Sequence, residues 1–105
     1  MKNLSAICEP TRAKILQVIA RHGTIAAGDI CANFSISNAA ISQHLKILKE
    51  ANFVNMEIDA KRRLYSINPN GINAISDWVN ELKQNMENRL DRLENFLEAK
   101  KDLNS

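Results

Sequence analysis

The sequence has few of the residues that mark several other classes of protein. Its 105 residues include only two cysteines, three glycines and two prolines. Two cysteines are too few for a disulfide scaffold, so Cys8 and Cys31 are expected to remain thiols in a reducing compartment. The three glycines form no glycine-rich loop that could cradle a phosphate.

Long apolar runs are also missing. No stretch approaches the roughly 20 apolar residues that a membrane-spanning helix needs. The N-terminus lacks the apolar segment of a secretory signal. Both absences predict a cytoplasmic protein without a membrane partner.

Histidine is scarce as well, since His22 and His44 are the only two. A transition-metal site needs about three or four converging ligands, and no such set can be assembled from this sequence. No serine or cysteine has an evident base, and no carboxylate pair lies in a recognisable frame. We therefore expect no catalytic residue, no metal, no cofactor and no enzymatic activity.

The composition is typical of one small globular domain, expected to span residues 1–105. Its residues are 45% hydrophobic and 25% charged, and the formal net charge is only +2. Residues 1–67 hold nine lysines and arginines against five acidic residues, whereas residues 68–105 hold five against seven. The first part of the chain therefore favours a polyanionic partner.

Helical signals dominate the first part of the chain. Pro10 fits the first position of a helix that ends before Gly23, and apolar residues recur between them at helical spacing. We expect a short helix over 2–8 before it and another over 26–34 after it, with residues 24–25 extended or in a brief strand.

A further helix is expected from residue 38 to residue 51. Ser37 is a good N-cap because its hydroxyl can accept a hydrogen bond from the free N–H groups of the next turn. Ile41, Leu45 and Leu48 keep one apolar face of this helix and are expected to point into the core.

After this helix the apolar period changes. Residues 53–58 and 63–67 alternate apolar and polar side chains, as half-buried strands do, and the polar residues 59–62 between them are turn-like. The two runs are expected to form a β-hairpin. The predicted fold class is therefore mainly α with a small β-hairpin (α+β).

The last segment is expected to be one long helix over 72–103. Its apolar residues recur at steps of three and four for about 25 residues, which is roughly 37 Å of helix. The same helix of a second subunit is the simplest cover for so long an apolar stripe. The predicted homodimer interface consists of Leu4, Ile75, Trp78, Val79, Leu82, Met86, Leu90 and Leu93.

A short helix, a break, a capped helix and a basic-tipped hairpin, in this order, predict a winged helix-turn-helix. The N-terminal residues of such a recognition helix face base edges in the major groove. Asn and Gln can bind adenine, hydroxyls can bind bases or phosphates, and Lys and Arg can neutralise phosphate. The predicted DNA contacts are Ser37, Asn38, Ala39, Ser42, Gln43, His44 and Lys46 on the helix and Lys61, Arg62 and Arg63 on the wing.

Two of the polar residues have a second interpretation. His44 either contacts DNA or packs and hydrogen-bonds within the protein. Arg12 either approaches a phosphate or is a solvated surface charge, and we favour the second.

Three ordered motifs resemble the ArsR-type winged-helix repressors. They are Glu9-Pro10-Thr11-Arg12 with Ile15-Leu16, similar to D-P-T-R-x-x-I-L; Ser37 with Ile41-Ser42-Gln43-His44-Leu45, Leu48, Ala51 and Val54, similar to the family's recognition-helix signature; and Arg63-Leu64-Tyr65-Ser66-Ile67-Asn68-Pro69, similar to its second wing strand. Gln43 lies where a basic residue is common in the family, and Asn38 lies where Gln is common. These departures leave the operator sequence open.

The family includes metal sensors and metal-blind members. Arsenic-type sensors carry C-x-C-x-x-C before the turn, at the positions of Ala26, Gly28 and Cys31 in this sequence. Zinc-binding members use His and carboxylates on the last helix, but residues 72–103 contain no His. The resemblance therefore implies the metal-blind branch, whose members often repress their own operon.

Together these patterns predict a sequence-specific transcriptional regulator. We expect a dimeric repressor that binds an inverted-repeat operator in double-stranded DNA through the recognition helix 37–51 and the wing 54–67. One alternative is a winged-helix module that binds a protein, although such a surface would favour aromatic residues and Met. Another is a repressor that senses oxidation through Cys8 and Cys31, whose Cα atoms would then lie within about 7 Å.

Overall fold

The structure, a computed structural model, describes residues 4–103, with side chains as far as residue 99. The chain divides into two compact units, Met1–Ile75 and Ser76–Ser105. Among the described residues, the first unit contains four helices, three strands and the start of a fifth helix, and the second unit contains the rest of that helix. The expectation of one domain over residues 1–105 stays a prediction.

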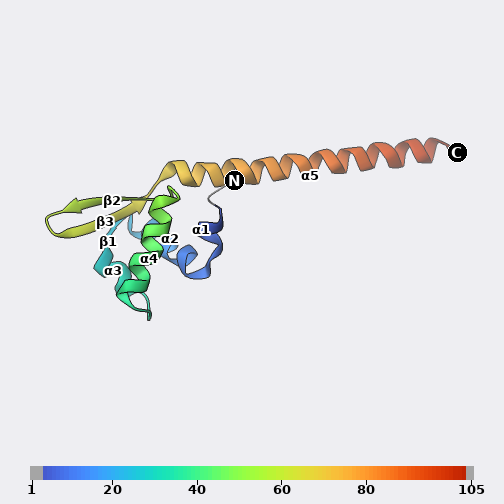
Figure 1. The fold of residues 1–105 in the computed structure, drawn as a ribbon. Coiled ribbons are helices and arrows are strands. Elements are labelled where there is room, and N and C mark those ends of the chain that lie inside the picture. The colour runs from blue at the N-terminus through green and yellow to red at the C-terminus, as the bar shows by residue number, and fades with distance from the viewer. Residues whose placement is uncertain (1–3, 104–105) are drawn as a thin grey trace. The chain divides into compact units, whose positions relative to one another are not determined.

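Four helices belong wholly to the first unit: α1 (Ser5–Cys8), α2 (Pro10–His22), α3 (Ala27–Ala32) and α4 (Asn38–Glu50) (Figure 1). The bounds predicted for α2 are confirmed, with Pro10 in its first turn and Gly23 as its C-cap. Residues 2 and 3 of the predicted first helix lie outside the described residues, and Leu4 is the N-cap of α1 instead of part of the helix.

Helices α3 and α4 are shorter than predicted, and the structure at their ends gives the reason. Residue 26 belongs to a strand, and α3 ends where the side chain of Asn33 donates to the carbonyl of Asp29 at 2.8 Å. Helix α4 ends at Glu50 because Asn52 takes the left-handed conformation with φ 64°, which cannot continue a helix.

Three antiparallel strands form one sheet: β1 (Thr24–Ala26), β2 (Val54–Asp59) and β3 (Arg62–Ile67), in the order β1-β3-β2. The predicted hairpin is therefore confirmed, and the extended residues 24–25 are part of a true strand. Tyr65 pairs with Ile25 on one side and with Met56 on the other, which places its buried side chain at the centre of the sheet.

The core of the first unit lies between the helices and this sheet. Its fully buried members are Ile15, Ile19, Ile30, Ile41, Leu45, Leu48, Phe53 and Val54, and each is at most 2% exposed. The inward face predicted for α4 is confirmed because Ile41, Leu45 and Leu48 are among them. Burial of these branched and aromatic side chains is the main source of stability in so small a unit.

Helix α5 (Pro69–Leu103) begins three residues before the predicted start at residue 72. Pro69 suits a first helical position, and the side chain of Asn68 accepts a hydrogen bond from the backbone N–H of Asn70 at 3.0 Å. The backbone N–H of Asn68 also donates to the carbonyl of Phe53 at 2.9 Å, which ties the start of α5 to the turn before β2. None of the described helices is long and apolar enough to cross a membrane.

Candidate nucleic-acid interface

Helices α3 and α4 are joined by the short connection over residues 33–37. The backbone N–H groups of Asn33 and Phe34 donate to the carbonyls of Ile30 and Cys31, at 3.0 and 3.2 Å, and close the end of α3. The Ser37 hydroxyl accepts from the N–H of Ala40 at 3.1 Å, so the predicted N-cap of α4 is confirmed. These hydrogen bonds define the end of α3 and the start of α4.

The exposed face of α4 is polar and lies opposite its buried face. The buried residues Ile41, Leu45 and Leu48 recur at steps of four and three, as one face of a helix does. Six of the predicted contact residues are exposed on the helix or at its start: Ser37, Asn38, Ala39, Ser42, Gln43 and Lys46. Their amide, hydroxyl and ammonium groups are donors and acceptors suited to base edges and phosphates.

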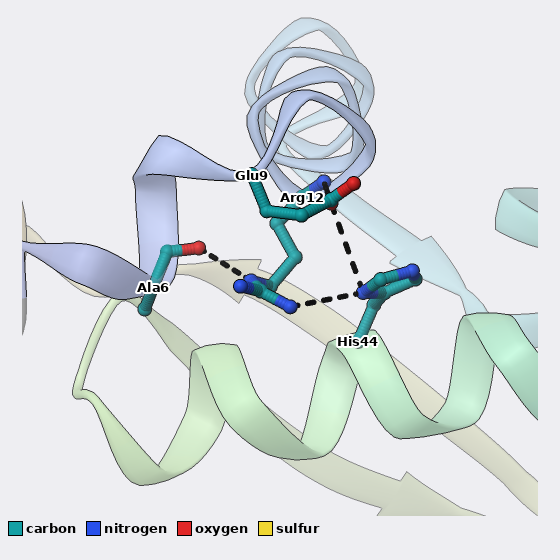
Figure 2. Close-up of polar contacts among 4 residues, drawn as sticks. All are labelled: Ala6, Glu9, Arg12 and His44. Carbon is teal, nitrogen blue, oxygen red and sulfur yellow. Dashed lines mark hydrogen bonds and ion pairs between the residues drawn. The ribbon is translucent and has the colours of Figure 1, made fainter.

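His44 differs from the other predicted contacts on α4. Its side chain is only 21% exposed and lies beside the first turn of α2. Figure 2 shows one ring nitrogen directed toward Arg12 and Glu9. The structure therefore places this residue at a contact between helices.

The guanidinium of Arg12 forms hydrogen bonds in two directions (Figure 2). Its Nε donates to the carbonyl of Ala6 at 2.6 Å, and its NH1 lies 3.3 Å from Nδ1 of His44. The side chain is half-buried. The expectation that Arg12 is a solvated surface charge is therefore wrong.

Glu9 caps the same turn of α2. Its carboxylate accepts from the backbone N–H of Arg12 at 2.8 Å and also lies 3.9 Å from Nδ1 of His44. The hydrogen bond from the Arg12 backbone is the main cause that lowers the pKa of Glu9 below its ordinary value of 4.5. The backbone N–H of Thr11 acts in the same direction.

The wing is the hairpin of β2 and β3, and its tip carries the three basic residues that were predicted to contact DNA. Lys61, Arg62 and Arg63 are all exposed. Arg62 lies 3.9 Å from Asp59 across the turn, a contact between two largely exposed side chains that adds little stability. The basic tip also lines one side of a hollow of about 410 Å³, and the start of α3 lines the other side.

The residues predicted for the dimer interface divide by exposure. Leu4, Ile75 and Trp78 are half-buried, and Ile75 packs against the core of the first unit. The remaining five, Val79, Leu82, Met86, Leu90 and Leu93, are exposed by 42% to 60% along α5. Ile72, Phe96 and Leu97 are exposed on the same helix.

The thiols and the acidic and histidine side chains of the described residues form no candidate metal site. Cys8 is exposed, Cys31 is half-buried, and both are free thiols. Among the described residues, no group of three or more His, Cys, Asp or Glu side chains lies close enough to hold a metal ion. That the protein binds no metal stays a prediction, as does the thiol-based alternative.

The contacts of Arg12 and Glu9 with His44, and the exposure of Ile58 on the wing, were not predicted from the sequence. Ile58 is 69% exposed on the wing, opposite Arg63 in the register of the hairpin. Residues 54, 56 and 58 lie on the same side of β2, so the alternation that predicts burial of Val54 also predicts the side on which Ile58 lies. Ile58 is exposed because the strand extends past the end of the core. The contact between Arg12 and His44 joins residues 32 positions apart, so only the two motifs that contain them offered a hint.

The fold and this surface define the class of the protein: it is a winged helix-turn-helix protein, with α4 as the second helix of the motif and the β2–β3 hairpin as the wing. Residues 9–56 match the model of the bacterial regulatory protein family arsR. The chain belongs to the arsR family and is a DNA-binding transcriptional regulator.

Relatives of known name agree with this assignment. The chain is 38% identical over 74 residues to the transcriptional repressor SdpR of Bacillus subtilis, a match that covers 70% of this chain and 81% of SdpR. It is 37% identical over 70 residues to the HTH-type transcriptional regulator Rv2034 of Mycobacterium tuberculosis, a match that covers 67% of this chain and 64% of Rv2034. The crystal structure of NolR from Sinorhizobium fredii matches with a TM-score of 0.61 and 30% identity, over 75% of this chain and 78% of NolR.

Proposed function

We propose that the protein is a homodimeric repressor that binds an inverted-repeat operator near a promoter and blocks transcription there. The observation that carries this proposal is the division of α4 into a buried apolar face and an exposed face of Ser, Asn, Gln and Lys. A surface built to bind a protein would be enriched in aromatic residues and Met instead.

In the proposed complex the start of α4 enters the major groove. Asn38 and Gln43 are suited to paired hydrogen bonds with adenine, and the Ser42 hydroxyl suits a base or a phosphate. Lys46, one turn further along the exposed face, would neutralise a phosphate. The contacts with base edges supply the sequence preference, and the contacts with phosphates position the helix.

The wing supplies affinity that depends little on sequence. Lys61, Arg62 and Arg63 are exposed at the hairpin tip and suit the phosphate backbone or the minor groove. Each phosphate that the wing neutralises releases counterions, so binding should weaken steeply as salt rises.

The proposed dimer forms through α5. Its exposed apolar side chains follow the steps of three and four of a helix-pairing stripe, from Val79 to Leu93. A contiguous apolar stripe of this length is costly to leave in water, and the second copy of the chain carries the matching stripe. Two recognition helices in a symmetric dimer would reach successive major grooves about 34 Å, or about 10 bp, apart.

Fluorescence anisotropy tests the proposal directly. The purified protein is titrated onto DNA from upstream of its own gene and onto scrambled DNA of the same length, across a series of salt concentrations. We expect a preference of about 10³-fold or more for the upstream DNA, with a steep negative salt slope. Equal and weak binding to both DNAs would contradict a sequence-specific operator there and favour the protein-binding alternative.

A further inference from the structure

We propose that Arg12 is a positioning residue for the recognition helix: it holds α4 against α1 and α2 by keeping His44 in the neutral form that carries its hydrogen on Nε2. Protonation of His44 breaks this contact and weakens operator binding. The inference rests on the proposed function, in which α4 is the helix that reads DNA.

The donors and acceptors decide the form of His44. An arginine side chain only donates hydrogen bonds and keeps its charge in proteins. Its NH1 lies 3.3 Å from Nδ1 of His44, so Nδ1 must accept and the ring hydrogen must lie on Nε2. Figure 2 shows this second nitrogen directed away from Arg12 and Glu9.

Glu9 competes for the same nitrogen. Its Oε2 lies 3.9 Å from Nδ1, beyond hydrogen-bond distance, whereas the Arg12 nitrogen lies at 3.3 Å. One ring nitrogen cannot accept from Arg12 and donate to Glu9 at once. The distances therefore favour the neutral ring that is bound to Arg12.

Protonation would reverse this preference. A protonated Nδ1 directs its hydrogen at the guanidinium, which is itself a positive donor, so the two groups repel each other. The nearest acceptor is then the carboxylate of Glu9. The ring must turn from Arg12 toward Glu9, and α4 loses its hydrogen bond to Arg12.

The other ionisable groups around α4 do not take part in this exchange. Helix α4 packs against α1, α2, α3 and β2. Within the described part of the chain, no hydrogen bond or ion pair joins His44 to their remaining ionisable side chains, which are Cys8, Lys14, Arg21, His22, Asp29, Cys31, Glu57 and Asp59.

The guanidinium of Arg12 couples three helices. Its Nε satisfies the carbonyl of Ala6 in α1, its backbone lies in the first turn of α2, and its NH1 reaches α4. Carbonyls at the end of a helix lack partners within that helix, so Arg12 also closes α1. A small movement of this one side chain therefore breaks or weakens the hydrogen bond that joins the recognition helix α4 to α1 and α2.

The first test needs no DNA and no variant. Nitrogen-15 NMR of the two histidine rings reports which nitrogen carries the hydrogen in the neutral form. We expect Nε2–H for His44. His22 is the internal control, because its Nδ1 lies 2.8 Å from the carbonyl of Val18 and must carry the hydrogen. A neutral His44 with its hydrogen on Nδ1 would overturn the inference.

Two variants of His44 separate a positioning role from a DNA contact. In His44→Asn the side-chain oxygen occupies the place of Nδ1 and can still accept from Arg12, whereas in His44→Gln the polar atoms occupy the place of Nε2. We expect His44→Asn to keep operator affinity within about twofold and His44→Gln to lose about tenfold, the scale of one hydrogen bond to a charged group. The opposite order would show that His44 binds DNA through Nε2 and would overturn the inference.

Arg12→Gln should lose operator affinity by about tenfold for the same reason. The matched control is Lys14→Gln, which removes the same charge from an exposed position of α2. Hydrogen exchange of the α4 amides in the free protein gives a readout independent of DNA, and we expect faster exchange in Arg12→Gln only. Equal exchange and equal affinity in the two variants would contradict the positioning role.

The pH profile gives a further test with a definite sign. We expect wild-type affinity to fall on acidification and that of His44→Asn to stay level. A histidine that touches phosphate would instead strengthen binding as it gains charge. Failure of the wild type to prefer its operator would overturn the proposed function, whereas the NMR result judges the contact of Arg12 with His44 separately.

Discussion

Two residues have local structural roles: Glu9 through its carboxylate, and Gly71 through the absence of a Cβ. The carboxylate of Glu9 accepts the N–H of Arg12 at the start of α2, where the helix dipole also favours a negative charge. Gly71 is buried, and a Cβ at that position would overlap the carbonyl oxygen of Asn52 and lie 2.8 Å from a ring carbon of Phe53. Both residues lead to predictions for stability.

We predict that the stability contributed by Glu9 depends on pH. Its pKa is lowered in the folded protein, mainly by the hydrogen bond from the Arg12 backbone. The contribution is therefore present above the ordinary value of 4.5 and is lost as the pH falls through the lowered pKa. Thermal unfolding of wild type and Glu9→Gln should show a gap just above pH 4.5 that narrows as the pH falls below that value. A gap that stays constant or widens below pH 4.5 would contradict the lowered pKa, and Glu57→Gln, exposed on β2, is the control.

Gly71→Ala should destabilise the first unit by about 1–3 kcal/mol, the usual cost of overpacking. The carbonyl of Asn52 belongs to the backbone and cannot move aside cheaply. Gly28→Ala is the matched control, because nothing lies within 4 Å of its added Cβ and alanine favours its helix. Urea unfolding of the two variants measures the difference, and equal midpoints would contradict the close contact at Gly71.

The elements that matter most are the wing and the recognition helix. The wing has a tight turn in which Ala60 takes the left-handed conformation with φ 57°, although it is not glycine. Its basic residues lie next to that turn, so the conformation of the turn decides where their charges lie.

Ala60→Gly should stabilise the protein by about 1 kcal/mol, because the left-handed region costs an L-residue roughly that amount and costs glycine little. The control is Ala39→Gly, at an exposed position of α4, which should cost about 1 kcal/mol. Thermal unfolding measures both changes. A destabilised Ala60→Gly variant would show that the turn is not strained.

Replacement of Lys61, Arg62 and Arg63 by alanine should weaken binding to operator and scrambled DNA alike. Each lost phosphate contact should reduce the salt slope by about one unit. The control, a triple alanine variant at Lys14, Arg21 and Lys83, removes the same charge from exposed positions outside the wing. Anisotropy across a salt series compares the two, and equal slopes in the wing variant and the wild type would exclude the wing from the DNA interface.

For the whole molecule, the proposed pairing of α5 with a second copy predicts the oligomeric state. Leu82→Lys places a charge in the apolar stripe, where Leu82 is 49% exposed in the single chain. If α5 pairs with a second copy, this charge must be buried, and the variant should be a monomer with weaker operator binding. Sedimentation measures the mass, and Lys83→Glu is the control at the next position of the helix. A monomeric wild type, or a dimeric Leu82→Lys variant, would contradict the proposed interface.

Much of the fold could be predicted from local signals. Pro10, Gly23 and Ser37 mark helix ends because their preferences arise within one turn of the chain. The buried face of α4 and the hairpin follow from apolar periods of 3.6 and 2. Strand β1 was the weakest signal, because three residues carry no usable period and form a strand only by pairing with β3.

The sequence predicted which side chains of the candidate site face solvent, but it did not predict which of them contact each other. The exposed residues of α4 and the wing follow from patterns along the chain. The wrong expectation for Arg12 came from reading the residue alone, since its partners lie 6 and 32 positions away.

The sequence by itself determined the class of this protein: the order of its helices and strands, the inward face of α4, the apolar stripe of α5 and the family motifs. These features are local or periodic, so the physical reasons for them act within a few residues. Only the tertiary structure decided which distant groups meet, namely Arg12 with His44 and Gly71 with Asn52. Such contacts depend on how helices pack in three dimensions, and no spacing along the chain encodes that packing.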